Sequence, residues 1–313
     1  MADEDMFACF GDDELPASAP QSTFSAVLRA KLIVAEKEYL SGCMEDLGAP
    51  EASRSLKEAF SAVASQDGLA CIRHGGAAHG AADTRLRDGW PHVAWRELYC
   101  LGALCAAAGY DATGQSEDAM RMTDMAAILG APTPLVRAFV TEIEPRIEKA
   151  LSAGPVLSFD RPPLRNDELA PAKGKATPMS GVLHLDLKWP AFDRWRDLGY
   201  LRQQLGHRWV PVELGVGEIR ESMMSFGAFL DTHLLPRLAG DKADVAYVAQ
   251  HGLFDHVFNL AADFTCPPTP DEVEKVNAWI GTDGTVTPLH FDSYDNYFVQ
   301  VVGYKFVRTY ASS

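Results

Sequence analysis

Residues 285–292 read TVTPLHFD, a short β-like run that holds His290 and Asp292 two positions apart. In a strand, side chains at i and i+2 project from the same face, so the run predicts an imidazole and a carboxylate aimed into one cavity. Such a pair supplies two of the three ligands of a 2-His-1-carboxylate iron site. The pattern His-x-Asp is weak evidence by itself, because the chain holds a second copy of it at His184 and Asp186.

A lysine follows in the run KFVRTY (305–310), whose alternation places Lys305, Val307 and Thr309 on one face. A lysine that points into a small β-barrel needs an anion beside it, because an unpaired buried charge is very costly. A bound dicarboxylate would supply that anion. The alternative is a lysine on the solvated face of the strand, and the run itself leaves both open.

Short β-like runs are spread over the C-terminal part of the chain, whereas the N-terminal part has helical spacing of apolar residues. The predicted strands are 182–187, 209–215, 243–251, 276–281, 285–292, 297–303 and 305–310, with helices near 190–206 and 218–235 between them. The predicted N-terminal helices are 24–48, 51–65, 93–110, 115–130 and 133–151, and the Gly- and Ala-rich residues 72–89 are predicted to be a loop. Within 93–110, Trp95, Tyr99, Leu101, Leu104 and Cys105 are predicted core residues. The fold class is therefore α+β.

Composition divides the chain into four parts. Residues 1–21 form a disordered acidic N-terminus, and 22–151 an all-α helical domain. Residues 152–181, rich in Pro, Gly and charge, are a linker. Residues 182–313 form the sheet-bearing domain.

Charge and cysteine usage narrow the class of partner and compartment. The chain has 28 Lys and Arg against 43 Asp and Glu, a formal charge of -15, which argues against direct binding of nucleic acid and slightly favours basic partners. The six cysteines show no Cys-x-x-Cys pair, which favours a reducing compartment. The acidic N-terminus is unlike a signal peptide, and no apolar run reaches the length of a membrane span. We therefore expect residence in the nucleus or cytoplasm.

The stretch from Asn277 to Lys305 resembles the first half of the Jumonji-C (JmjC) oxygenase core, in its lysine demethylase eight-like, or arginyl-hydroxylase, branch. The motifs that carry this resemblance are Asn277-Ala-Trp279, Gly284-Thr-Val-Thr287-Pro-Leu-His290-Phe-Asp292, Asn296, Gly303-Tyr-Lys305 and Arg308-x-Tyr310. Upstream, Val210-Pro-Val-Glu213-Leu-Gly215 and Tyr247-Val-Ala-Gln250-His251 are similar to the same branch. In the helical region, Trp95-Arg and the phrase from Arg121-Met-Thr-Asp124-Met to Leu129-Gly-Ala-Pro132 are also similar, so the match covers most of residues 90–310.

The resemblance implies a cupin-like double-stranded β-helix that uses iron(II), 2-oxoglutarate and dioxygen. It assigns His290 and Asp292 to the iron, Tyr247, Thr287, Asn296 and Lys305 to 2-oxoglutarate, and Glu213, Gln250 and Trp279 to the protein substrate. Thr287 has the opposite parity to His290, so a bulge at Pro288 would be needed. The implied substrate is a basic protein bearing arginine or methyl-lysine, such as a histone or another chromatin or ribosomal protein. Such an enzyme would be a hydroxylase or a demethylase that regulates chromatin.

The same resemblance implies a third iron ligand, a histidine on a later strand, whereas only Ala311, Ser312 and Ser313 follow Tyr310. We therefore expect an incomplete, C-terminally truncated domain with little or no turnover as this chain. One alternative is a non-catalytic interaction protein that uses the helical domain and keeps a vestigial cupin. Another is a metal cupin that acts on small molecules.

Overall fold

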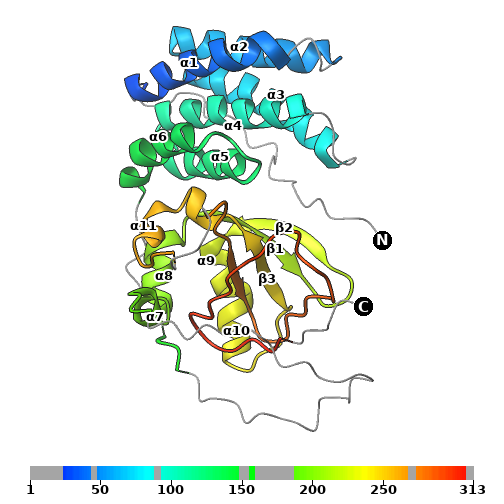
Figure 1. The fold of residues 1–313 in the computed structure, drawn as a ribbon. Helices are drawn as coiled ribbons and strands as arrows, with labels where there is room; N and C mark the ends of the chain where they lie inside the picture. The colour runs from blue at the N-terminus through cyan, green and yellow to red at the C-terminus, as the bar shows by residue number, and fades with distance from the viewer. Residues whose placement is uncertain are drawn as a thin grey trace.

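The computed structural model describes residues 24–43, 48–87, 93–147, 155–158, 187–266 and 273–307. Helices α1 to α6 form one half of the molecule, and a sheet with short helices forms the other (Figure 1). The α+β fold class is confirmed. No helix in the described ranges is both long and apolar enough to cross a membrane.

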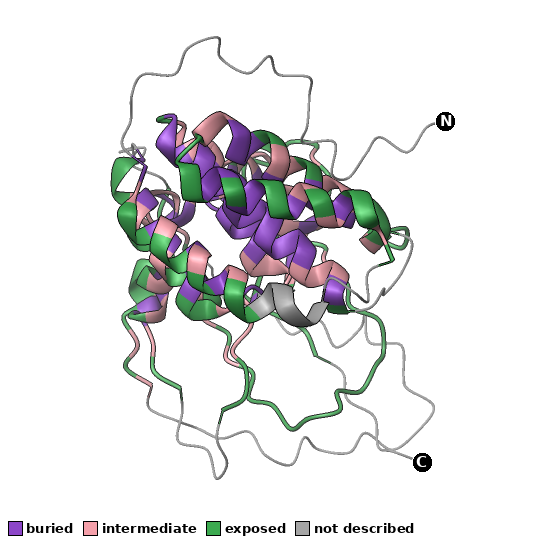
Figure 2. Ribbon diagram, turned by 90° about the horizontal axis from the view of Figure 1, so that it is seen from above, coloured by how far each residue is buried: buried purple, intermediate pink, exposed green. Residues whose placement is uncertain are grey.

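The helical half is built around α4. Its helices are α1 (Ala26–Cys43), α2 (Pro50–Ser65), α3 (Gly68–Arg87), α4 (Val93–Ala112), α5 (Ser116–Ile128) and α6 (Thr133–Ile143), followed by the 3-10 turn η1 (Glu144–Arg146). Because α4 is apolar almost all round, it lies in the middle of the layer, and buried residues gather there when the molecule is seen from above (Figure 2).

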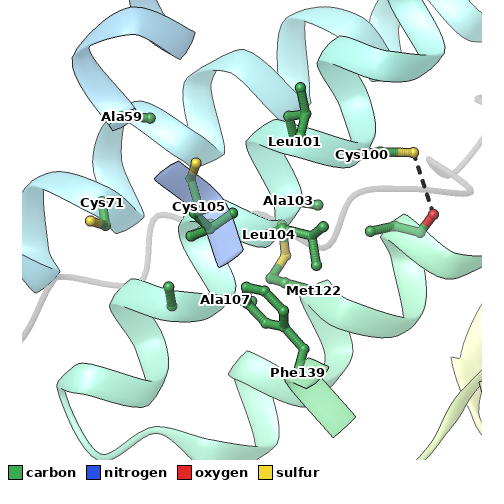
Figure 3. Packing of buried hydrophobic residues seen from close by; sticks show 14 of the residues in the cluster. Ala59, Cys71, Cys100, Leu101, Ala103, Leu104, Cys105, Ala107, Met122 and Phe139 are labelled. Atoms are coloured by element: carbon green, nitrogen blue, oxygen red, sulfur yellow. Dashed lines mark hydrogen bonds between the residues drawn. The ribbon is translucent and has the colours of Figure 1, made fainter. Parts of the chain in front are cut away.

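The core of this half confirms four of the five predicted α4 residues. Tyr99, Leu101, Leu104 and Cys105 are buried, whereas Trp95 is partly buried against the cluster. Met122 of α5 and Phe139 of α6 lie beside Leu104, and the Cys100 thiol donates to the Ala126 carbonyl at 3.4 Å (Figure 3).

The loop predicted for residues 72–89 is wrong, since helix α3 occupies most of this stretch. Gly75 of this helix is a packing residue. A Cβ on Gly75 would lie 2.6 Å from the Ala106 nitrogen and 2.7 Å from the Gly102 oxygen of α4. The two helices therefore approach each other at backbone distance, and tertiary packing overrides the low helix propensity of glycine.

The other half contains a four-stranded antiparallel sheet in the order β2-β1-β3-β4. The strands are β1 (Trp209–Leu214), β2 (Arg220–Ser225), β3 (Ala246–His251) and β4 (Ala278–Gly281). The short helices are α7 (Ala191–Arg194), α8 (Leu198–Leu205), α9 (Phe226–Phe229), the π-helix η2 (Leu230–Leu234), α10 (Leu235–Leu238), the 3-10 turn η3 (Leu253–Asp255) and α11 (Phe258–Ala261). Alternate residues of β1 are buried among them, so the sheet has a packed face and a second, more open face.

Two secondary-structure predictions in this half need correction. The helix expected near 218–235 begins only after Ser225, whose hydroxyl accepts a hydrogen bond from the Ala228 amide. The residues before Ser225 form β2 instead, because they pair with β1 along its whole length. The strands expected at 285–292, 297–303 and 305–307 do not form, and residues 285–307 have no helix or strand. A strand needs a neighbour for its backbone hydrogen bonds, and β4 is paired with β3 alone among the described strands. The predicted strand at 182–187 and residues 308–310 fall outside the described residues, apart from residue 187.

Candidate active site

One row of side chains crosses the open face of the sheet. Glu213 of β1 is paired with Glu221 of β2 on one side and with Tyr247 of β3 on the other, and Tyr247 is paired with Gly281 of β4. Directly opposite residues in an antiparallel sheet share a face, so these side chains are neighbours. A Cβ on Gly281 would lie 2.7 Å from Cδ2 of Tyr247, so the tyrosine ring occupies the space that the glycine leaves.

Lys305 reaches this row from the segment that follows β4. Its Nζ donates to the Tyr247 hydroxyl at 3.1 Å and lies 5.2 Å from the ring centroid of Phe298. The Phe298 ring is in turn 6.5 Å from that of Trp279 in β4. The segment therefore crosses the sheet over β3 and β4, where Figure 1 draws it in red. Lys305 is exposed, and no acidic side chain in the described ranges forms an ion pair with it.

His290 and Asp292 also face each other, with Nε2 and Oδ1 3.7 Å apart. The Nδ1 of His290 donates to the Pro288 carbonyl at 2.8 Å, so Nε2 is the nitrogen that faces Asp292. The other oxygen of Asp292 accepts from the Asn296 amide at 2.8 Å. Both side chains are about half exposed, at 58% and 51%.

This donor set fits a divalent transition metal in kind. Imidazole and carboxylate are the ligand types of an iron(II) site, and a ligating histidine usually donates its second N–H to a carbonyl or carboxylate. His290 makes such a bond to Pro288. Within the described ranges no group of three His, Cys, Asp or Glu residues is placed to hold a metal, so these residues offer two ligands.

The two predicted substrate residues on β1 and β3 differ in setting. Glu213 is partly buried, and its burial together with the negative charge of Glu221 raises the pKa of its carboxyl. Gln250 is exposed and has a positive φ of 46°, at a register shift between Val248 and His251. Glu213 therefore lies beside Tyr247, whereas Gln250 lies at the bend that ends β3.

Thr287 is not brought to the lysine. It is exposed, and no hydrogen bond in the described residues links it to Tyr247 or Lys305. Glu221, Gly281 and Phe298 are neighbours of the predicted site residues that no local sequence pattern predicts. Only the strand register reveals Glu221 and Gly281, and register cannot be read from a single strand.

The comparisons with known proteins agree with this architecture. A family model described as "Cupin-like domain" matches residues 180–309. The JmjC domain-containing protein F of Dictyostelium discoideum is 26% identical over an alignment of 307 residues, which covers 72% of this chain and 65% of that protein. The lysine-specific demethylase JMJ30 of Arabidopsis thaliana is 38% identical over an alignment of 135 residues, which covers 40% of this chain and 30% of the relative. Lysine-specific demethylase 8 of Danio rerio is 37% identical over an alignment of 160 residues, which covers 47% of this chain and 37% of the relative.

The chain is a relative of JmjC domain-containing proteins. The sheet-bearing half is its cupin-like region, and the JmjC family is one of oxygenases that includes proteins named as lysine demethylases. The chain spans 65% of the length of the first of these relatives and smaller shares of the other two. The assignments of individual residues to iron, 2-oxoglutarate and substrate remain predictions.

Proposed function

We propose that this JmjC chain contributes to iron(II)- and 2-oxoglutarate-dependent oxidation of a side chain on a basic protein in the nucleus or cytoplasm. The observation that carries the proposal is the hydrogen bond between Lys305 and Tyr247, residues 58 positions apart. It joins an ammonium and a phenol on a face where the lysine has no anionic partner among the described residues. A dicarboxylate would supply that partner.

In this proposal Lys305 pairs with the distal carboxylate of 2-oxoglutarate, and the Tyr247 hydroxyl donates to the same group. Thr287 and Asn296 are further proposed 2-oxoglutarate contacts. His290 and Asp292 are the iron ligands that the described residues supply. When bound, iron(II) with dioxygen and 2-oxoglutarate supplies the oxidising chemistry, and the protein provides placement.

The charge on the open face favours a cationic substrate side chain. Glu213 and Glu221 lie directly opposite each other, and the repulsion between them contributes to the raised pKa of Glu213. A guanidinium can donate to both carboxylates, which relieves that repulsion. Trp279, 43% exposed on the adjacent strand β4, offers an indole for a cation-π contact. We place Gln250 at the edge of the same substrate surface.

These contacts favour arginine hydroxylation over demethylation. A guanidinium has five N–H donors for the two carboxylates, whereas methylation removes donors from a lysine ammonium. Demethylation of methyl-lysine is the second candidate, because two of the relatives are named lysine-specific demethylases.

The proposal is tested by titrating the purified chain with 2-oxoglutarate in the presence of Mn(II), a redox-inert substitute for iron(II). Loss of the charge pair in Lys305→Met should weaken binding about tenfold, the equivalent of about 1.4 kcal/mol. Lys242→Met is the matched control, since Lys242 is exposed and outside the proposed site. Equal affinities of the native chain and Lys305→Met would refute the 2-oxoglutarate role and favour a non-catalytic interaction protein.

A further inference from the structure

A buried carboxylate of the helical half is hydrogen bonded to the sheet-bearing half. Asp124 of α5 has no exposed surface. It accepts from Nε of Arg208 at 3.0 Å, from the Trp209 backbone amide at 2.9 Å and from Nδ1 of His256 at 2.9 Å. Burial alone would raise the pKa of Asp124, but Arg208 and His256 lower it well below its usual value. The carboxylate is therefore ionised and fully used by partners from the other half.

The hydrogen-bonded chain continues to the end of β3. The Nε2 atoms of His256 and His251 are 3.0 Å apart. Because Nδ1 of His256 already donates to Asp124, the two facing nitrogens share one proton. Burial lowers the pKa of His251 to about 3, so this ring is neutral near pH 7. Asp124, His256 and His251 thus form one continuous series of hydrogen bonds across the two halves.

His251 is turned inward by a local departure from strand geometry. In a regular strand, alternation would place His251 on the same face as Tyr247 and turn Gln250 toward the core. The register shift against β4 and the positive φ of Gln250 reverse this order, so that His251 is buried and Gln250 is exposed. A positive φ at a residue other than glycine is sterically strained, so the surrounding contacts must hold Gln250 in this conformation.

We infer that Asp124 is a positioning residue, which acts through His256 and His251 to hold the bend that presents Tyr247 and Gln250 on the open face of the sheet. The helical half is then part of the machinery that shapes the site, rather than a separate binding module. The inference rests on the proposed function only in treating Tyr247 and Gln250 as ligand-binding residues. The bend itself is independent of that proposal.

A purely structural role would be to hold the two halves together, and a matched variant separates this from positioning. Asp111 of α4 is also a buried carboxylate, with 1% of its side chain exposed, and it pairs with Arg146. Both residues of this pair belong to the helical half. Asp111→Asn therefore tests the loss of a buried ion pair without a connection to β3.

The experiment is hydrogen-exchange mass spectrometry on the intact native chain, Asp124→Asn and Asp111→Asn, all below their unfolding temperatures. We expect about tenfold faster exchange over residues 246–251 in Asp124→Asn relative to the native chain, and no such change in Asp111→Asn. Unchanged exchange in Asp124→Asn, or the same increase in both variants, would overturn the inference.

A second variant covers the case in which Asp124→Asn does not fold. His256→Phe keeps the Arg208–Asp124 pair and the ring volume but removes the link to His251. It should show the same faster exchange over 246–251 and bind 2-oxoglutarate with Mn(II) several-fold more weakly. If the native chain does not bind 2-oxoglutarate, the proposed function fails, whereas the exchange measurement still decides the positioning role. Native exchange over 246–251 in His256→Phe would contradict it.

Discussion

Two glycines in the same helix should respond in opposite directions to the same substitution. At Gly80 of α3, an added Cβ meets nothing within 4 Å. Gly80→Ala should therefore stabilise the chain by about 0.5–1 kcal/mol, the difference between alanine and glycine in a helix. At Gly75 the same Cβ would lie 2.6 Å from the backbone nitrogen of Ala106 and 2.7 Å from the oxygen of Gly102.

Neither backbone atom can rotate away as a side chain could, so Gly75→Ala must push α3 and α4 apart. Overpacking of this kind costs about 1–3 kcal/mol, which offsets the gain in helix propensity and leaves a net loss of up to about 2.5 kcal/mol. Urea unfolding followed by far-UV circular dichroism measures both variants against the native chain. A Gly75→Ala variant as stable as Gly80→Ala would refute the backbone-distance contact between the two helices.

Three further predictions concern the sheet. Because the pKa of His251 is lowered from 6.5 to about 3, the unfolded chain binds more protons than the folded chain below pH 6.5. The contribution of His251 to stability is full above that pH and decreases by up to about 1.4 kcal/mol per pH unit as the pH falls. Between about pH 7.5 and 5, the thermal unfolding temperature should therefore decline less in His251→Phe than in the native chain. Equal declines in the two proteins would contradict this. Gly281→Ala should displace the Tyr247 ring and weaken 2-oxoglutarate binding several-fold, whereas native affinity would show that the ring has room. Glu221→Gln should lower the pKa of Glu213 in an NMR titration, and an unchanged pKa would remove Glu221 as a cause of the shift.

The spacing of apolar residues predicts those helices and strands whose own sequence favours the conformation. The apolar face of α2 and the all-round apolar α4 follow from periodicity, and β1 and β3 follow from alternation. Helix α3 was missed because glycine favours loops in isolation, and its value here depends on a partner helix far along the chain. Strand β2 was missed because its sequence RESMMS carries little β signal, and pairing with β1 decides its conformation.

The same distinction holds for the candidate site. His290 and Asp292 could be found from a three-residue motif, and Lys305 from a cation in an alternating run. The contact between Lys305 and Tyr247, the space at Gly281 and the repulsion from Glu221 depend on which strands lie side by side. One sequence without its relatives does not contain that register.

We propose that His290 and Asp292 hold a metal next to which Lys305 and Tyr247 hold 2-oxoglutarate. Calorimetric titration of 2-oxoglutarate with and without Mn(II) tests this most directly, in the native chain, in His290→Ala and in Asp295→Asn, which changes an exposed neighbour outside the proposed site. We expect tighter binding with Mn(II) in the native chain and in Asp295→Asn, and no effect of Mn(II) in His290→Ala. Equal affinities with and without metal in the native chain, or a metal effect that survives in His290→Ala, would contradict it.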